Sequence, residues 1–377
     1  MAEQKNAPEL RFPEFDNNWL KKRLKDISDI NPKSKQNIPK QFNYIDLESV
    51  KKGKIINISN ISKDKAPSRA QRIAQKQDIF FQTVRPYQQN NFIYNFDIDD
   101  VVVSTGYAQI RTNNHKYYIF TLLHTYRFLV NVLLNCTGSN YPAINSTDLS
   151  NIEVYLTENK LEQEKIGVFF SKLDRQIELE EEKLELLEQQ KNGYMQKIFS
   201  KELRFKDENG NVYPNWEIQK LGQIAMINTG KSKISNEIDG EFFNLGSTGI
   251  IGKSNHFDYE GSFLLTARVG HYAGSLYTFK GKANITDNTI FMQTNLSLEF
   301  IKELLNNYNL KRLAFGSGQP LIKSSELKNL KFNIPCVDEI EKIGKLFNKL
   351  NQTIELHTSK LELLKQRKKG LLQKMFI

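Results

Sequence analysis

The feature that most constrains this chain is an internal repeat that runs without a gap. Residues 164–199 read EKIGVFFSKLDRQIELEEEKLELLEQQKNGYMQKIF, and residues 341–376 read EKIGKLFNKLNQTIELHTSKLELLKQRKKGLLQKMF. The two segments align at one constant offset, with about 21 of 36 positions identical, which chance similarity between two helices does not produce. The chain is therefore built from two copies of a common unit.

The repeat extends outward in weaker form. A Gly-Ser-x-x-Pro segment precedes each copy, at 138–142 and at 316–320. A Glu-Leu-Arg-Phe entry followed by Asn-Trp occurs twice, at 9–12 with 18–19 and at 202–205 with 215–216. The order of entry, variable body, Gly-Ser-x-x-Pro segment and repeated segment thus occurs two times.

The two variable bodies, roughly residues 25–137 and 222–315, hardly resemble each other in sequence. A duplicated frame with unlike contents is what we expect of a protein that reads two different things with one geometry. The alternative is a duplicated structural protein whose halves have drifted. That alternative predicts equal sequence divergence in the bodies and in the frame, which consists of the repeated entry, Gly-Ser-x-x-Pro and helix segments. The sequence does not show this.

Apolar residues in both repeated segments recur in steps of three and four, which predicts one long amphipathic helix from each. At 1.5 Å per residue each helix is roughly 50–55 Å long. Polar residues interrupt the apolar seam at equivalent positions, Glu180 and Lys191 in one helix, His357 and Lys368 in the other. We expect the helices to pair antiparallel within one chain. An intermolecular coiled coil is the alternative.

Near the middle of such a pair, Glu180 and His357 are expected either to hydrogen-bond or simply to reach solvent at a helix edge. The fold class expected is α+β: two recognition domains of mixed β-sheet and helices, joined by two long antiparallel coiled-coil helices with pseudo-twofold symmetry. The domain boundaries predicted are 1–157, 158–199, 200–336 and 337–377.

Charge gives the first indication of a partner. The chain has 377 residues with a formal net charge of +10 and a pI near 9.2, which favours a polyanion, most commonly nucleic acid. No apolar run is long enough for a membrane span, and the polar N-terminus lacks a secretory signal. Cys136 and Cys336 have no metal-like spacing. We therefore expect a cytoplasmic protein with reduced thiols and no membrane contact.

The bodies contain β-rich runs that are predicted to break into loops rich in Arg, Tyr, Gln and Asn. Such side chains suit base edges and phosphates, since Arg pairs with guanine and Gln or Asn with adenine. The alternative for each is a solvated loop residue, or partial core packing for the two tyrosines at 107 and 272. The candidate DNA-binding residues are Arg85, Tyr87, Gln88, Gln89, Asn90, Tyr107, Gln109, Arg111, Lys231, Lys253, Arg268, His271 and Tyr272.

Catalytic motifs are missing from the sequence. The stretch from Gly246 to Ser254 resembles a phosphate-binding loop, but its glycines are one residue too far apart, and Ser247 stands where the first glycine belongs. There is no Pro-Pro pair, which an amino-methyltransferase motif requires, and no His/Cys/Asp cluster with metal spacing. A DNA-binding chain without these motifs is expected to be no enzyme, and to direct the catalysis of another subunit.

The pattern resembles the specificity subunit of type I restriction–modification systems over essentially the whole chain. The marks are the duplicated Glu-Lys-Ile-Gly helices that end in Gln-Lys-Ile-Phe at 196–199 and Gln-Lys-Met-Phe at 373–376, the Gly-Ser-x-x-Pro segments and the paired entries. The first body departs from the commoner Arg-x-Gly loop of the family, with Arg85-Pro86-Tyr87 in its place.

The resemblance implies that each domain reads one half of a bipartite site in double-stranded DNA, and that the helices fix the gap. It also implies two modification subunits, which carry S-adenosylmethionine and methylate adenine, and restriction subunits that use ATP and Mg. No cofactor is expected on this chain itself. Two other functions stay open: a stand-alone or fused DNA methyltransferase or nuclease, and a coiled-coil scaffold that binds no DNA.

Overall fold

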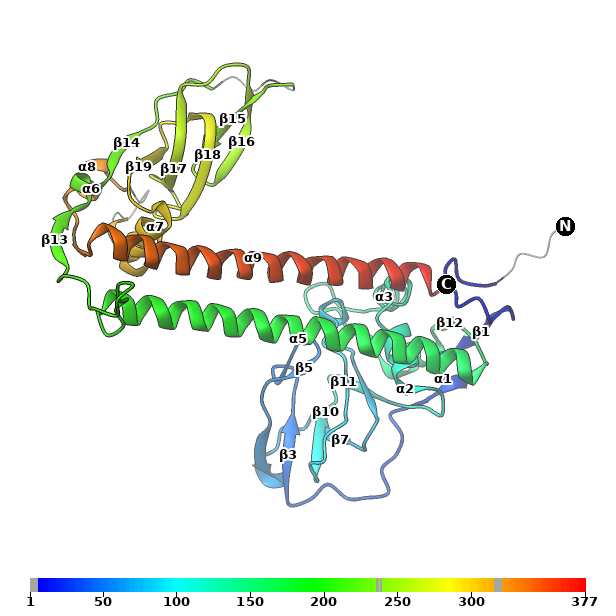
Figure 1. The fold of residues 1–377 in the computed structure, drawn as a ribbon. Helices are drawn as coiled ribbons and strands as arrows, with labels where there is room; N and C mark the ends of the chain where they lie inside the picture. The colour runs from blue at the N-terminus through cyan, green and yellow to red at the C-terminus, as the bar shows by residue number, and fades with distance from the viewer. Residues whose placement is uncertain (1–5, 235–236, 238, 315–320) are drawn as a thin grey trace. The chain divides into compact units, whose positions relative to one another are not determined.

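The computed structural model describes residues 6–234, 237, 239–314 and 321–377. The chain forms two compact units (Figure 1), each described here by itself. The first unit comprises Met1–Glu181 with Lys360–Ile377, and the second comprises Glu182–Ser359. Each unit therefore contains one body together with part of each long helix.

The first unit contains short strands and short helices before its long helix. Its strands are β1 (Leu20–Arg23), β2 (Asp29–Ile30), β3 (Gln41–Ile45), β4 (Val50–Lys51), β5 (Lys54–Ile55), β6 (Ser59–Ser62), β7 (Ala70–Ile73), β8 (Ile79–Gln82), β9 (Phe92–Ile93), β10 (Val101–Ser104), β11 (Tyr107–Arg111) and β12 (Glu153–Leu156). Its helices are α1 (Leu24–Ile27), η1 (Lys63–Lys65), η2 (Pro86–Gln88), α2 (Lys116–Leu122), α3 (Tyr126–Leu134), α4 (Ser146–Asn151) and the first part of α5 (Lys160–Phe199).

Two four-stranded sheets form the first body, in the orders β6-β3-β10-β7 and β2-β11-β8-β9. The sequence Val101-Val102-Val103 is buried along its whole length because β10 lies inside its sheet between β3 and β7. The frame adds a separate pair, in which β1 of the entry runs antiparallel to β12 just before α5. The entry and the start of the long helix are thus held together.

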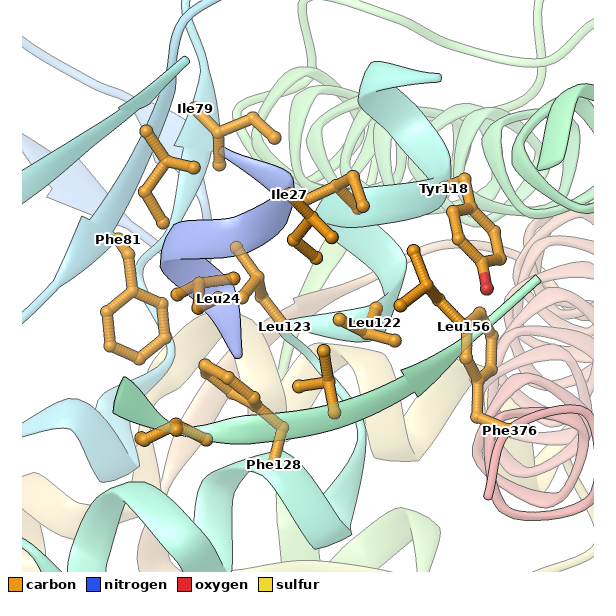
Figure 2. Close-up of a cluster of buried hydrophobic side chains, with 14 of the residues drawn as sticks. Leu24, Ile27, Ile79, Phe81, Tyr118, Leu122, Leu123, Phe128, Leu156 and Phe376 are labelled. Atoms are coloured by element: carbon orange, nitrogen blue, oxygen red, sulfur yellow. The ribbon is translucent and has the colours of Figure 1, made fainter. Parts of the chain in front are cut away.

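The main core of the first unit joins body and frame (Figure 2). Leu24 and Ile27 of α1 pack among Leu122, Phe128 and other apolar side chains of the body. Phe376, at the end of the second long helix, packs beside Trp19 and Tyr118 with ring centroids 5.8 and 5.6 Å apart. The C-terminal end of the chain therefore completes the core of the N-terminal body.

The second unit repeats this plan with longer strands. Its strands are β13 (Glu217–Lys220), β14 (Met226–Thr229), β15 (Phe242–Gly246), β16 (Gly249–Ser254), β17 (Tyr259–Ala267), β18 (Leu276–Ile285), β19 (Thr289–Gln293) and β20 (Lys331–Ile334). Its helices are the last part of α5, α6 (Leu221–Ile224), α7 (Leu298–Tyr308), η3 (Leu310–Leu313), α8 (Ser324–Asn329) and the first part of α9 (Val337–Lys374).

The two bodies share a strand topology that their sequences do not reveal. One sheet of the first body has the strand order β2-β11-β8-β9. The sheet of the second body has the order β14-β19-β17-β18-β15-β16, and its first four strands match that order. The parallel pair β3–β10 of the first body corresponds to the parallel pair β15–β18 of the second. The duplication therefore extends into the bodies, where sheet geometry is kept and side chains have changed.

The long helices run antiparallel within each unit. In the first unit, Asp174 of α5 pairs with Lys368 of α9, and Glu180 pairs with Lys360, so the residue number rises on one helix as it falls on the other. In the second unit, the rings of Phe199 and Phe347 stack with centroids 6.3 Å apart, and Lys191 and Asn351 reach the same oxygen of Glu303, so the numbering again runs in opposite directions on the two helices. The prediction of antiparallel pairing inside one chain is confirmed within each unit.

The expectation that Glu180 and His357 reach solvent at a helix edge is wrong. Their exposed fractions are 6% and 9%, so both side chains are buried. Glu180 has Lys360 at 2.8 Å, which satisfies the charge of its carboxylate. A hydrogen bond between Glu180 and His357 stays a prediction.

The expected α+β fold class, with two domains and two long helices, is confirmed. The helices, at 160–199 and 337–374, begin four residues before the repeated segments and end within two residues of them. The predicted domain boundaries stay a prediction, since the two compact units divide each long helix near its middle. Among the described helices, none has a stretch sufficiently long and apolar to cross a membrane.

Candidate nucleic-acid interface

Each entry segment is fixed to the start of a long helix by a buried carboxylate in the first turns of that helix. In the first unit, Glu162 accepts from Arg11 Nε and Nη2 at 2.6 and 2.8 Å and from Trp19 Nε1 at 3.4 Å. In the second, Glu339 accepts from Arg204 Nε and Nη2 at 2.7 Å and from Trp216 Nε1 at 3.0 Å. The repeated Arg and Trp of the entry segments are thereby explained.

A glycine in each long helix lets one body helix approach closely. The N-cap residue of α2 is His115, and the N-cap residue of α7 is Ser297. A Cβ added at Gly167 would collide with the His115 ring, and a Cβ added at Gly344 would collide with Ser297. The repeated Glu-Lys-Ile-Gly motif therefore marks the place where body and helix touch.

In the first body, the loop after β8 is shaped by a buried amide. Gln82 is 1% exposed, and its Nε2 donates to Val84 O and to Gln88 Oε1, both at 2.8 Å. Its Oε1 accepts from the backbone N–H of Asn90 at 3.1 Å. One side chain therefore bridges both ends of the loop and supports its shape.

Arg85 stands at the turn of this loop in the left-handed conformation, with φ of 53°. Its backbone N–H donates to Pro142 O at 2.7 Å, and its guanidinium lies 4.2 Å from the centroid of the Tyr141 ring. Tyr141 belongs to the Gly-Ser-x-x-Pro segment and is 63% exposed. The segment that the sequence marks as repeated frame thus supports the predicted arginine.

A depression of about 720 Å³ opens beside this loop. Its basic and polar lining includes Lys51, Arg69, Arg85, Gln88 and Asn90. Asp46 and Glu48 also line it, so the depression carries both signs of charge. Mixed donors and carboxylate acceptors suit the edges of bases better than a row of phosphates.

Three of the predicted residues of the first body are not placed as the sequence indicated. Residues 107–111 form strand β11 instead of a loop, because Thr105 and Gly106 make a tight turn after β10. Tyr107 is 0% exposed in a hydrophobic cluster, and its hydroxyl has no hydrogen-bond partner among the described residues. Burial raises the pKa of Tyr107, so it stays neutral. Tyr107 is a core residue.

Gln109 and Arg111 are engaged by a buried carboxylate. Asp78 accepts from Gln109 Nε2 at 2.6 Å and from Arg111 Nε and Nη2 at 2.8 and 2.9 Å. Gln109 is 3% exposed, so its prediction as a DNA contact is wrong. The hydrogen bonds to Asp78 raise the pKa of Arg111, and that side chain is one-third exposed. Asp78, which the sequence reasoning missed, lies just before β8.

In the second body the predicted order of strand and glycine-rich loop is confirmed. Strand β17 ends at Ala267, and Gly270 and Gly274 take positive φ of 80° and 85° in the loop that follows. A Cβ added at Gly274 would lie 2.9 Å from the backbone of Leu310 and Lys311. The loop therefore packs directly on η3, whose Lys311 and Arg312 are exposed. The sequence patterns of loops did not identify Lys311 and Arg312, because both residues lie in a short helix.

The backbone makes equivalent hydrogen bonds just after β8 in the first body and just after β17 in the second; these two places are called the strand exits below. Thr83 O accepts from Ile144 N at 3.0 Å, and Arg268 O accepts from Ile322 N at 2.9 Å. In each exit, the next residue forms an isolated β-bridge with the residue that follows the proline of the Gly-Ser-x-x-Pro segment. Arg268 therefore corresponds to Thr83, and Arg85 takes the left-handed position that Gly270 has in the second body. The arginine has moved by two residues along the loop.

The remaining candidates are accessible, with one difference from the prediction. Tyr87 is 50% exposed and Tyr272 is 56% exposed, and the His271 ring lies edge-on to Tyr272. Lys231 is exposed in the loop after β14, as predicted. Lys253 is exposed but lies in β16, at the edge of the sheet, instead of in a loop.

Gln89 also takes a left-handed conformation, with φ of 51°, at the end of η2. The second Gly-Ser-x-x-Pro segment, residues 316–320, lies outside the described residues. Within the described part of the chain, no cluster of three or more His, Cys, Asp or Glu side chains has the arrangement of a metal site.

Comparison with known proteins gives consistent findings. The chain is similar to the specificity subunit of the type I restriction enzyme MjaVIII from Methanocaldococcus jannaschii, with 24% identity over 271 residues. That similarity covers 62% of this chain and 64% of the relative, so it spans less than two-thirds of the relative's length.

Two solved structures share the fold. One is a type I restriction–modification S subunit from M. genitalium, with TM-score 0.71, 17% identity and coverage of 98% of this chain and 99% of that chain. The other belongs to a study of complex assembly and conformational transition of the type I R-M system, with TM-score 0.51, 20% identity and coverage of 95% and 97%. The model of the type I restriction modification DNA specificity domain matches residues 16–189 and 213–366, in both halves of the chain, and the chain therefore belongs to that family.

Proposed function

We propose that this chain is the DNA-recognition subunit of a type I restriction–modification complex, in which each body reads one half of a bipartite site. The observation that carries the proposal is the equivalence of the two strand exits. Thr83 and Arg268 make the same backbone bonds, yet the side chains presented beyond them differ. One backbone frame with two different sets of base-directed side chains is what reading two different sequences requires.

The side chains around each exit suit DNA. Arg85 on Tyr141, with Gln88 and Asn90, offers planar donors and acceptors at one edge of the first body. Arg268 with His271, Lys311 and Arg312 offers a more basic surface in the second. The net charge of +10 supports association with a polyanion and predicts strong salt dependence.

The partners proposed are two modification subunits, which would supply S-adenosylmethionine and methylate adenine, and restriction subunits, which would supply ATP- and Mg-dependent cleavage. Two modification subunits fit a frame that occurs twice, because each copy presents the same backbone and the same buried Arg–Glu–Trp cluster. This chain would then perform no chemical step, and the long helices would set the gap between half-sites.

Binding of the purified chain separates this function from its alternatives. We expect affinity for duplex DNA that falls steeply with salt, and no binding of S-adenosylmethionine by the chain alone. Binding of S-adenosylmethionine would favour a methyltransferase. A chain that binds no DNA at any salt concentration, with or without modification subunits, would favour a scaffold.

A further inference from the structure

The junction between each body and the long helices contains an equivalent lysine. Lys191 of α5 and Lys368 of α9 occupy the same position of the repeat, and their side chains are 19% and 27% exposed. A partly buried ammonium group in an apolar seam needs a carboxylate partner. Each lysine finds one inside its own unit, but the two carboxylates come from different elements.

In the first unit the carboxylate belongs to the long helix. Lys368 Nζ lies 2.5 Å from Asp174 Oδ1, and Asp174 is on α5. The body contributes a neutral group, the hydroxyl of Tyr117 on α2, which donates to Asp174 Oδ2 at 2.9 Å. Burial, with the nearby Asp174 carboxylate, raises the pKa of Tyr117, so this hydroxyl remains a donor.

In the second unit the carboxylate belongs to the body. Position 351, which corresponds to Asp174, is an asparagine, and Lys191 Nζ lies 2.8 Å from Glu303 Oε1 on α7. Asn351 Nδ2 donates to the same oxygen at 2.8 Å and to Glu299 Oε1 at 2.5 Å. Burial alone would raise the pKa of Glu303, but bonds from Lys191, Asn351 and Asn306 outweigh it and lower the pKa.

The two arrangements correspond residue by residue. Because the caps of α2 and α7 rest on equivalent glycines, Tyr117 corresponds to Glu299, and Thr121 corresponds to Glu303. The negative charge is therefore on the long helix in the first unit and on the body in the second. The position of a body in the first or second unit is called the first or second place below. Thr121 is as buried as Glu303, with exposed fractions of 4% and 0%, so the positions are alike in burial.

Exchange of the bodies between the two places would break both arrangements. The first body at the second place would bring Thr121 to Lys191 and Asn351, and the lysine would lose its carboxylate. The second body at the first place would bring Glu303 to Asp174, together with Glu299, whose carboxylate is paired with Lys302 at 3.1 Å. An unpaired or repelled charge at a buried junction is strongly destabilising.

We propose that this junction selects which body each place in the chain accepts. The fitting body at the first place presents neutral donors to Asp174, and the fitting body at the second place brings its own acid for Lys191. A body taken from another chain of this fold would thus be accepted at a given place only if it presents the matching group there. The inference rests on contacts within each unit and does not depend on the proposed DNA function.

The test uses the full chain and moves the charge in the second unit. Asn351→Asp adds a third carboxylate beside Glu299 and Glu303, and we expect the melting temperature of the chain to fall by about 5–10 °C. Asn348→Asp, the same change at an exposed position one turn away on α9, is the matched control. We expect it to leave the melting temperature within about 2 °C.

Rescue then separates the matching rule from a general intolerance of substitution. In the double variant Asn351→Asp/Glu303→Gln the acid sits on the helix, as in the first unit, and we expect at least half of the lost stability to return. The mirror experiment is Asp174→Asn, which is destabilising, with recovery on adding Thr121→Glu. The proposal is overturned if Asn351→Asp is no worse than Asn348→Asp, or if neither double variant exceeds its parent in melting temperature.

Discussion

Arg204 and Glu339 form a two-pronged ion pair in which Nε and Nη2 of the guanidinium each lie 2.7 Å from a carboxylate oxygen. Glu339 is fully buried, and the Arg204 side chain is 17% exposed. Trp216 donates to the same carboxylate at 3.0 Å. This cluster fastens the entry of the second unit to the start of α9, and the corresponding cluster of the first unit does the same for α5.

Loss of this carboxylate should therefore lower the stability of the second unit. Glu339→Ala leaves a guanidinium and an indole N–H without their partner, and we expect a loss of about 3–5 kcal/mol in the free energy of unfolding. Urea denaturation followed by far-UV circular dichroism measures it. Glu362→Ala, at an exposed position of the same helix, is the control and should cost under about 0.5 kcal/mol. Equal losses for the two variants would contradict the role given to Glu339.

Arg85 and Arg268 are expected to contact DNA, since each stands at an equivalent strand exit. If the contact is to a base, Ala should cost about 1–3 kcal/mol of binding and relax one position of the site. If it is to a phosphate, affinity should fall for all sequences, and the salt slope should shrink by about one unit. Titration of the complex with duplexes of changed sequence distinguishes the two. Unchanged binding for both variants would remove these residues from the interface.

Tyr107 should behave as a core residue. Its ring is fully buried, and its hydroxyl has no hydrogen-bond partner among the described residues. Because an unsatisfied buried hydroxyl is costly, Tyr107→Phe should leave stability unchanged or raise it by about 1 kcal/mol, with DNA affinity unchanged. Thermal unfolding and DNA titration of one sample measure both. A loss of DNA affinity without loss of stability would restore the original prediction that Tyr107 contacts DNA.

The gap between half-sites should follow the length of the long helices. Insertion of four residues near Glu182 adds about 6 Å to α5, at 1.5 Å per residue. We expect the gap to lengthen by one or two base pairs while both half-site sequences stay the same. Methylation mapping with the modification partner measures the gap. An unchanged gap in an insertion variant that still supports methylation would mean that another element sets the spacing.

The frame of this protein could be predicted from sequence because it occurs twice. Comparison of the two copies identified the helices to within four residues, and it indicated Lys191 and Lys368 as interruptions of the seam. Their carboxylate partners could not be predicted, since Glu303 lies in a variable body and Asp174 has no acidic counterpart at 351.

The candidate interface was harder to predict, because burial depends on tertiary pairing. Tyr107, Gln109 and Arg111 alternate as in a strand, but their polar character favoured a loop. Only the pairing of β11 with β8 shows that Asp78 engages Gln109 and Arg111. The common topology of the two bodies was also hidden, because hydrogen bonds between strands constrain the backbone and leave most side chains free to change.

The central claim, that each body reads its own half-site, is tested most directly by exchanging one body and mapping methylated adenines. Residues 222–315 would be replaced by the body of another family member, chosen with an acid at the position of Glu303 so that Lys191 keeps its partner. DNA exposed to the chimaera and its modification partner should show one half-site changed and the other unchanged. Change in both half-sites, or in neither, would contradict the account.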